Sequence, residues 1–298
     1  MGKVTSFRKA IDITPSLVQL VDEFLADLKT ENKSPHTLKN YQADLMAFHR
    51  FYGGNLSDLT PATLREYFGS LVETLSPASI SRKQASIKSF LRWAYRHDLI
   101  PANPMDKIGG VKLPESQPRF LPLDQVNKIL SVITDDRDRV LFTLISETGL
   151  RISEALAIKV EDLRLDTQEL TVHGKGKKDR TIHLVKTESL RLLKWYLKKR
   201  QITGGLVFRA CESKQRYGQA GKAIEYSVIA KAWRRYCHSI GIECTIHQLR
   251  HSYATDLINR GAPVEVVSKI LGHQNLQTTL RYAKVSDRTI RNTLENLR

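Results

Sequence analysis

The sequence is poor in cysteine and has no long apolar run, and both shortages narrow the class of protein. Its 298 residues include only three cysteines, Cys211, Cys237 and Cys244, and no two of them form a Cys-x-x-Cys pair. This composition excludes a secreted disulfide scaffold. No stretch approaches the about 20 apolar residues of a membrane span, and the first residues lack the apolar core of a signal peptide. We expect a cytoplasmic protein with reduced thiols and no contact with a membrane.

Acidic residues are also scarce relative to basic ones. The 47 Lys and Arg residues outnumber the 31 Asp and Glu residues, which gives a formal net charge of +16. The net charge is +4 up to Pro114 and +12 beyond it, so both parts of the chain are basic. A protein this basic is expected to meet a polyanion, most often nucleic acid. Charge alone also fits a basic soluble enzyme, so the residue patterns must decide.

Residues 15–100 carry the pattern of four amphipathic helices joined by short turns. Apolar residues recur at helical spacing over 17–28. Three more helices are expected to begin at Ser34-Pro35, Thr60-Pro61 and Ser76-Pro77, because Ser or Thr caps a helix and Pro suits its first position. This pattern predicts a four-helix unit.

The fourth of these helices, expected over 77–97, has a basic face. The sequence has no acidic residue between Glu73 and Asp98, and the apolar residues of this segment lie on the other side of the helix. A solvated surface usually mixes both signs of charge, so contact with the DNA backbone is the better interpretation. The candidate DNA-binding residues are Arg82, Lys83, Lys88, Arg92 and Arg96.

Proline and glycine cluster over residues 101–118 and mark a boundary between domains. We place an N-terminal helical domain at residues 1–113 and a second domain at residues 114–298. Within the second domain, residues 168–185 predict a β-hairpin with a basic turn, and most of the remainder predicts helices. The predicted fold class is mainly α with a small antiparallel β-sheet.

Four segments of the second domain carry polar residues that a core would not select. Each residue has an ordinary structural explanation when it is considered alone, such as a helix cap, a solvated turn or a buried ring. Together, two arginines, two histidines, a lysine and a tyrosine are what phosphodiester transfer without a metal requires. The candidate catalytic residues are Arg151, Lys175, His247, Arg250, His273 and Tyr282.

The reaction suggests a role for most of these candidates. Arg151 and Arg250 can bind the non-bridging oxygens of the phosphate as their charge grows in the transition state. Tyr282 can attack phosphorus, and a nearby histidine, His247, could accept its proton. Lys175, in the hairpin turn, could protonate the leaving 5′ oxygen. The sequence shows no carboxylate cluster and no Cys/His set with metal spacing, so we expect no metal or other cofactor.

These segments resemble the tyrosine recombinases of the phage integrase family, in particular the simple Xer-like branch. The resemblance covers nearly the whole chain. It is carried by Thr-Gly-Leu-Arg-Ile-Ser-Glu, Gly-Lys-Gly-Lys-Lys-Asp-Arg, His-Gln-Leu-Arg-His-Ser-Tyr-Ala-Thr, Leu-Gly-His and the final Tyr282. It implies a SAM-like core-binding domain before a catalytic domain. It also implies a site-specific recombinase that forms a 3′-phosphotyrosyl bond, frees a 5′-hydroxyl and needs neither ATP nor metal.

The resemblance places the six candidates on the family's catalytic positions and Glu154 on an acidic position that supports the active site. Lys177 and Lys178 compete with Lys175 for the role of general acid, and the family pattern favours Lys175. His251 follows Arg250 directly, and we expect it to point elsewhere on its helix and to be structural.

The resemblance also implies double-stranded DNA as the partner and a tetramer on two DNA sites, with two protomers active at a time. The tail, residues 287–298, is expected to form a helix that docks on a neighbouring protomer, although docking on its own domain also fits the sequence. A type IB topoisomerase and a non-catalytic DNA-binding relative are the alternatives. Resolution of chromosome dimers, resolution of plasmids or transposons, and integration of a mobile element remain open as biological roles.

Overall fold

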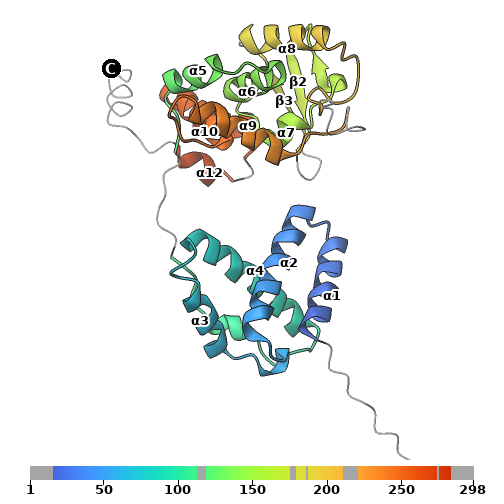
Figure 1. The fold of residues 1–298 in the computed structure, drawn as a ribbon, viewed down its shortest axis with the longest axis vertical. Coiled ribbons are helices and arrows are strands. Elements are labelled where there is room, and N and C mark those ends of the chain that lie inside the picture. Colours follow the sequence, from blue (N-terminus) through green and yellow to red (C-terminus); the bar gives the residue numbers. More distant parts are fainter. Residues whose placement is uncertain are drawn as a thin grey trace, which may run out of the picture. The chain divides into compact units, whose positions relative to one another are not determined.

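The chain folds into two compact units, Met1–Glu115 and Ser116–Arg298, each with a hydrophobic core of its own. Both units are mainly helical, and the second also contains the sheet (Figure 1). Within the part of the chain that is described, no helix has the length and apolar character needed to span a bilayer. This computed structural model describes residues 16–112, 119–174, 179–185, 187–210, 221–273 and 275–282.

Four α-helices make up most of the described part of the N-terminal unit, and they begin where the sequence predicts. Ser34, Thr60 and Ser76 each accept a hydrogen bond from the backbone N–H three residues later, and a proline follows each of them. Two short 3₁₀ helices, Leu56–Asp58 and Pro104–Lys107, complete the unit. The α-helices are α1 (Leu17–Thr30), α2 (Pro35–Tyr52), α3 (Pro61–Ser70) and α4 (Pro77–Arg96).

Aromatic side chains pack among aliphatic ones in the core of this unit. Phe24 of α1, Phe48 of α2 and Phe90 of α4 are almost completely buried. The rings of Phe24 and Phe90 meet edge to face, with their centroids 5.5 Å apart. Because burying one such side chain stabilises a fold by roughly 1.5–3 kcal/mol, this cluster fixes the packing of α4 and therefore which of its faces is exposed.

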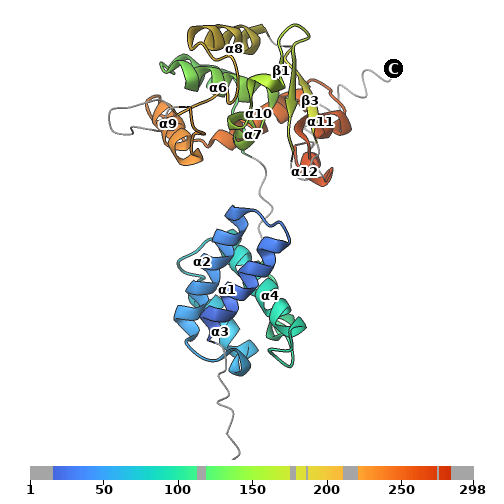
Figure 2. The same cartoon turned by 90° about the vertical axis from the view of Figure 1, so that its right-hand side faces the viewer.

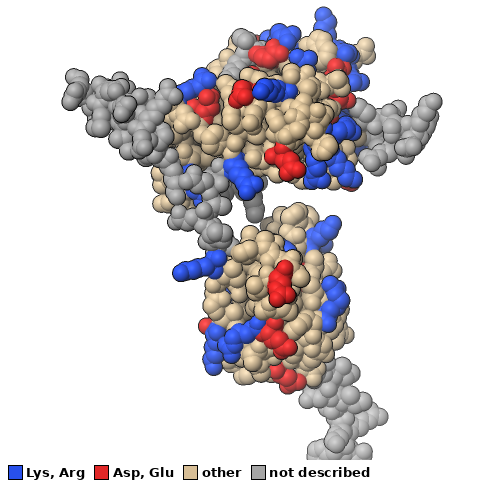
Figure 3. Space-filling view, turned by 60° about the vertical axis from the view of Figure 1, so that its left-hand side comes forward, with Lys and Arg blue, Asp and Glu red and all other residues tan. Residues whose placement is uncertain are grey.

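The five basic residues of α4 occupy two different environments. Arg82 and Lys83 form ion pairs with Asp44 of α2, and the Asp44 side chain is only 1% exposed. Figure 3 shows one face of the molecule, on which Lys and Arg are scattered among Asp and Glu on both units. The five candidates therefore do not form one set, because Arg82 and Lys83 are paired inside the unit. The other three are exposed and have no ion-pair partner among the described residues: Lys88, Arg92 and Arg96.

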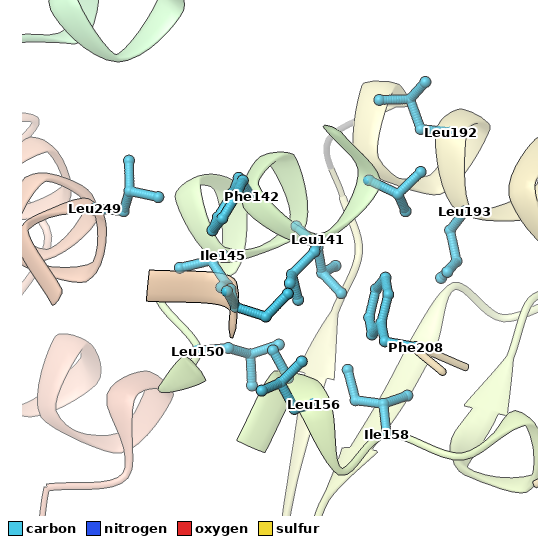
Figure 4. Packing of buried hydrophobic residues seen from close by; sticks show 14 of the residues in the cluster. Leu141, Phe142, Ile145, Leu150, Leu156, Ile158, Leu192, Leu193, Phe208 and Leu249 are labelled. Atoms are coloured by element: carbon cyan, nitrogen blue, oxygen red, sulfur yellow. The ribbon is translucent and has the colours of Figure 1, made fainter. Parts of the chain in front are cut away.

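The C-terminal unit is built around α6 (Asp136–Thr148). The neighbours of α6 include α8 (Thr187–Lys199) and α10 (Ile246–Asn259). In Figure 4, Leu192 and Leu193 of α8 approach α6 from one side and Leu249 of α10 approaches it from the other. The other α-helices described in this unit are α5 (Leu123–Ser131), α7 (Ile152–Leu156), α9 (Tyr226–His238), α11 (Val264–Leu271) and α12 (Gln277–Leu280).

Three short antiparallel strands form a sheet in the order β1 (Leu163–Arg164), β2 (Glu169–Val172), β3 (Arg180–His183). Strands β2 and β3 confirm the predicted hairpin, with Leu170 of β2 opposite Ile182 of β3. Strand β1 was not predicted, because two residues are too few to produce an alternating pattern. Figure 2 shows β3 beside α11. The hairpin turn with Lys175, Lys177 and Lys178 lies outside the described residues.

Candidate active site

Two helices of the C-terminal unit, α6 and α11, end in glycines with left-handed backbone geometry. Gly149 after α6 has φ +65°, and Gly272 after α11 has φ +66°. A Cβ at position 149 would lie 2.5 Å from the ring of Tyr253, so no larger residue fits this turn. Because Arg151 follows Gly149 by two residues and His273 follows Gly272 directly, the two turns set the directions of both functional side chains.

Arg250 of α10 connects these two turns. Its side chain is 1% exposed. One guanidinium nitrogen, Nη1, donates to the Gly149 carbonyl at 2.7 Å, and Nη2 donates to the Leu271 carbonyl at 2.7 Å. Both carbonyls lie at helix C-termini, whose partial negative charge offsets the cost of burying a cation. Burial lowers the pKa of Arg250 to about 10, and the positive charge of Arg151 adds to this effect, but the side chain remains cationic at neutral pH.

Glu154 of α7 binds two further arginines. It accepts a hydrogen bond from Arg151 Nη1 at 2.9 Å and two from Arg180 of β3, at 3.0 and 2.9 Å. Arg180 also donates from Nε to the Ile270 carbonyl of α11 at 3.0 Å. Burial alone would raise the pKa of Glu154, but the hydrogen bonds from Arg180 and from the Arg151 backbone N–H, with both positive charges, hold it at about 2. Glu154 is therefore ionised, and it orients an Arg151 side chain that remains 39% exposed.

Arg180 is a residue of this network that the sequence analysis missed. It lies in the segment Gly174–Arg180, whose lysines are the sequence candidates for the general acid. Its position at the start of β3, next to the sheet and close to the glycine turn at Gly272, was visible only in three dimensions. A Cβ at Gly272 would lie 3.0 Å from an Arg180 guanidinium nitrogen, so the small residue leaves room for the arginine.

Tyr282 follows α12, and its hydroxyl contacts a histidine. The hydroxyl oxygen lies 2.5 Å from Nδ1 of His251. The expectation that His251 points elsewhere is wrong. His247 and His251 are four residues apart on α10, so they share a face, and their ring centroids are 4.4 Å apart. The i, i+4 spacing was the signal that could have identified His251.

The other two histidines approach the tyrosine differently. His273 places its Nδ1 2.7 Å from Oγ1 of Thr279, a fully buried residue of α12. The His273 ring stacks on the Tyr282 ring at a centroid distance of 6.3 Å. The His247 ring is exposed, and no hydrogen bond joins it to another described residue. The proton-accepting role suggested for His247 therefore has no supporting contact with Tyr282 in this structure.

The protonation states of these groups follow from their surroundings. The His247 side chain is accessible to solvent at one edge, but the protein atoms around the rest of the ring partly desolvate it and lower its pKa, with Arg250 and Arg151 adding to the effect. Burial, with the nearby histidines and arginines, lowers the pKa values of His251 and His273 to about 4. All three are therefore neutral at pH 7, and each has one ring nitrogen free of a proton. Burial raises the pKa of Tyr282, while Arg250 and Arg151 act in the opposite direction.

One pocket, with a volume of about 350 Å³, contains five of the six predicted catalytic residues. The sixth, Lys175, lies outside the described residues. Two cationic guanidinium groups and neutral imidazoles around a phenol fit a phosphate anion. Among the residues that the structure describes, no group of three or more His, Cys, Asp or Glu side chains is arranged to hold a metal ion. The pocket is lined by Arg151, His247, Arg250, His251, His273, Thr278, Arg281 and Tyr282.

Two protein-family models match this chain. The model described as "Phage integrase family" matches residues 119–289, and "Phage integrase, N-terminal SAM-like domain" matches residues 21–98. The chain belongs to the phage integrase family. The resemblance inferred from the sequence and the predicted fold class are thereby confirmed.

Curated relatives agree with this family and match most of the chain. The tyrosine recombinase XerC of Myxococcus xanthus is 34% identical, over 91% of this chain and 94% of its own length. The tyrosine recombinase XerA of Pyrococcus horikoshii is 30% identical, over 93% of this chain and 92% of its own length. This member of the phage integrase family is accordingly a tyrosine recombinase, an enzyme that breaks and rejoins DNA strands. The comparisons do not favour a topoisomerase.

Solved structures share the fold at lower sequence identity. XerH bound to its difH substrate in a pre-cleavage complex has a TM-score of 0.74 and 20% identity, over 96% of this chain and 97% of that one. A lambda integrase tetramer bound to a Holliday junction also has a TM-score of 0.74, with 18% identity over 93% of this chain and 80% of that one. At such identities the likeness establishes the fold alone.

Proposed function

We propose that this recombinase cuts one DNA strand at a time by attack of the Tyr282 hydroxyl on a phosphodiester. A 3′-phosphotyrosyl bond forms and a 5′-hydroxyl leaves. The 5′-hydroxyl of a partner strand then attacks the linkage and releases the tyrosine. The observation that carries the proposal is the single pocket in which the Tyr282 hydroxyl lies with Arg151 and Arg250.

Charge and hydrogen-bond donors in this pocket support the chemistry. The transition state carries more negative charge than the substrate, and two preorganised guanidinium groups stabilise that charge. His247 and His273, being neutral, each have one ring N–H to donate to a phosphate oxygen. Lys175 remains our candidate for protonating the leaving 5′ oxygen. In this scheme the chain's own side chains supply the charge stabilisation, with no metal and no other cofactor.

We propose that double-stranded DNA is bound by both units. Residues 1–113 would act as the core-binding domain and residues 114–298 as the catalytic domain. The exposed basic residues of α4, Lys88, Arg92 and Arg96, support DNA contact by the first unit, because they have no acidic partner among the described residues. The lambda integrase neighbour is a tetramer on a Holliday junction, which supports four protomers acting on two sites.

The cellular role we propose is Xer-like, either resolution of chromosome or plasmid dimers or recombination of a small mobile element, with the protein acting in the cytoplasm on the DNA there. Curated relatives named XerC and XerA, matched over most of their length, support this branch of the family. The tail, residues 287–298, is proposed to dock on a neighbouring protomer. It lies outside the described residues.

The test uses a nicked suicide substrate that carries a DNA site selected from a random library. The wild-type protein should become covalently attached to the 3′ side of the cut, and the freed 5′ end should carry a hydroxyl. Tyr282→Phe should bind the same DNA with nearly unchanged affinity and form no adduct, because the ring can still pack but the nucleophile is gone. An equal yield of adduct from Tyr282→Phe would disprove the assignment.

A further inference from the structure

The contact between Tyr282 and His251 distinguishes His251 from the other two histidines of the pocket. Its Nδ1 lies 2.5 Å from the phenol oxygen. His273 uses its Nδ1 for Thr279 and meets the tyrosine ring through its own ring face. His247 touches the His251 ring edge to face, with an interplanar angle of 80°. Within the described residues, His251 is the histidine whose ring nitrogen reaches the nucleophilic oxygen.

The state of His251 suits it to accept a hydrogen bond. Burial, with the nearby His247 and Arg250, lowers its pKa to about 4, so the ring is neutral at pH 7. A neutral imidazole with its proton on Nε2 has a free lone pair on Nδ1, which can receive the O–H of the tyrosine. Tyr282 is protonated at the same pH, because burial raises its pKa. With this tautomer, the hydroxyl is the donor and His251 the acceptor.

We propose that His251 is the general base that takes the proton of Tyr282 during strand cleavage. As the bond between the tyrosine oxygen and phosphorus forms, the O–H proton moves to His251 Nδ1, and the bond from phosphorus to the 5′ oxygen breaks. The leaving 5′ oxygen takes its proton from the general acid. In rejoining, the imidazolium returns its proton to the tyrosine oxygen as that oxygen leaves phosphorus. This assignment rests on the function proposed above.

DNA binding itself should strengthen the base. In the free protein, Arg151 and Arg250 add positive charge around the pocket, with the neutral rings of His247 and His273 beside them. A phosphate anion bound between the two arginines cancels part of that charge and favours a cation at His251. The pKa of His251 should therefore rise toward its ordinary value once the scissile phosphate is in place. The free enzyme holds its nucleophile with a weak base, and the substrate makes that base stronger.

The first experiment separates proton transfer from positioning. In His251→Asn, the amide oxygen can still accept a hydrogen bond near the place of Nδ1, but it cannot take a proton. Single-turnover cleavage of the suicide substrate should fall about 100-fold or more, the usual size of a general-base effect, while DNA affinity is unchanged. The wild-type rate should decrease as the pH falls below the pKa of bound His251, and the Asn variant should lose this decrease.

Two further measurements identify the missing function. In His251→Ala, added imidazole should restore part of the rate, because the small base can enter the vacated space; His238→Ala, at an exposed site at the end of α9, should cleave normally and ignore imidazole. A substrate with sulfur in place of the bridging 5′ oxygen needs no general acid, because a thiolate leaves without a proton. The defect of the His251 variants should persist on this substrate, since the attacking hydroxyl still has to lose its proton.

The outcomes separate this inference from the proposed function. Cleavage by His251→Asn within threefold of wild type, or a defect that disappears on the sulfur substrate, would overturn the role of His251. The covalent adduct of the wild-type protein through Tyr282 would still stand in either case. If the wild-type protein forms no adduct at all, the proposed function fails and this inference fails with it.

Discussion

Each unit of the molecule contains a largely buried carboxylate, Asp44 in the first and Glu154 in the second, that accepts hydrogen bonds from two cationic side chains. Asp44 is 1% exposed and pairs with Arg82 and Lys83, and it also accepts a hydrogen bond from Ser86 at 2.9 Å. The Glu154 side chain is 9% exposed and pairs with Arg151 and Arg180, and Arg250 lies 3.9 Å from one of its carboxylate oxygens. Both clusters consist of a carboxylate and cationic side chains. Their different roles must therefore come from the chain segments that they connect.

The Asp44 cluster joins two neighbouring helices, α2 and α4, and its cations both lie within one turn of α4. The Glu154 cluster joins the turn before α7 to β3, and Arg180 continues to the last turn of α11. Its other cation, Arg151, also lines the pocket beside Tyr282. A buried ion cluster within a single helix pair stabilises packing, whereas one that joins several chain segments beside a pocket fixes the geometry of an anion site.

Neutralising each carboxylate should give the largest difference between the two clusters, in cleavage rate for Glu154 and in stability for Asp44. Glu154→Gln frees Arg151 from its fixed orientation, and a misplacement of about 1 Å at such a site costs about 100-fold in rate. We expect single-turnover cleavage of bound suicide substrate to fall by about this factor. Asp44→Asn should lower the free energy of unfolding, because a buried ion cluster loses its carboxylate, while cleavage per molecule of bound folded protein stays within about threefold of wild type.

Urea unfolding and cleavage at saturating DNA concentration measure both effects in parallel. The contrary result is that Asp44→Asn slows cleavage as strongly as Glu154→Gln does in samples that are equally well folded. The Asp44 cluster would then influence the active site and could not be regarded as packing alone.

A second prediction concerns the pH dependence of stability. The folded pKa of Glu154 is about 2, below its ordinary value of 4.5. A carboxyl group with a lowered folded pKa contributes stability that is fully present above pH 4.5 and is lost as the pH falls toward 2. The wild-type protein should therefore exceed Glu154→Gln in unfolding free energy by on the order of 2 kcal/mol at pH 7. Urea unfolding from pH 7 to pH 3 should show this difference narrowing below pH 4.5; a constant difference would show that the Glu154 charge is not responsible.

The sequence predicted the helices and the candidate catalytic residues better than it predicted which side chains contact one another. Ser-Pro and Thr-Pro pairs located three helix starts, because capping is a local interaction. The spacing of His247 and Arg250 predicted that both lie on one face of a helix, and the structure has both in the lining of the same pocket. The burial of Asp44 was not predictable, because a carboxylate is usually exposed and nothing local marks the two cations on another helix. The contact of His251 with a tyrosine 31 residues away was equally hidden, although its spacing of four from His247 already placed both histidines on one face of α10.

The last and smallest effect tests the division of the basic residues on α4. Lys88→Gln removes an exposed cation and should leave the unfolding free energy within about 0.5 kcal/mol of wild type. If Lys88 contacts a phosphate, this variant should also reduce the slope of log affinity against log salt by about 0.9. Lys83→Met is the matched variant on the same helix. It should lower stability, because Asp44 loses a partner, and it should leave the salt slope unchanged, because the Lys83 side chain is only 13% exposed.

Binding titrations from low to moderate salt, with a thermal melt of each variant, measure both quantities. Arg92→Gln and Arg96→Gln extend the series, and unequal effects are expected because a stripe on a helix need not face DNA along its whole length. An equal reduction of the salt slope in Lys83→Met and Lys88→Gln would mean that the ion pair between Lys83 and Asp44 opens when DNA binds. The Asp44 cluster, like the Glu154 cluster, would then take part in binding the substrate. Wild-type affinity and slope in all the exposed variants would instead make this side of α4 a solvated surface, and the DNA contacts of the first unit would have to come from another helix.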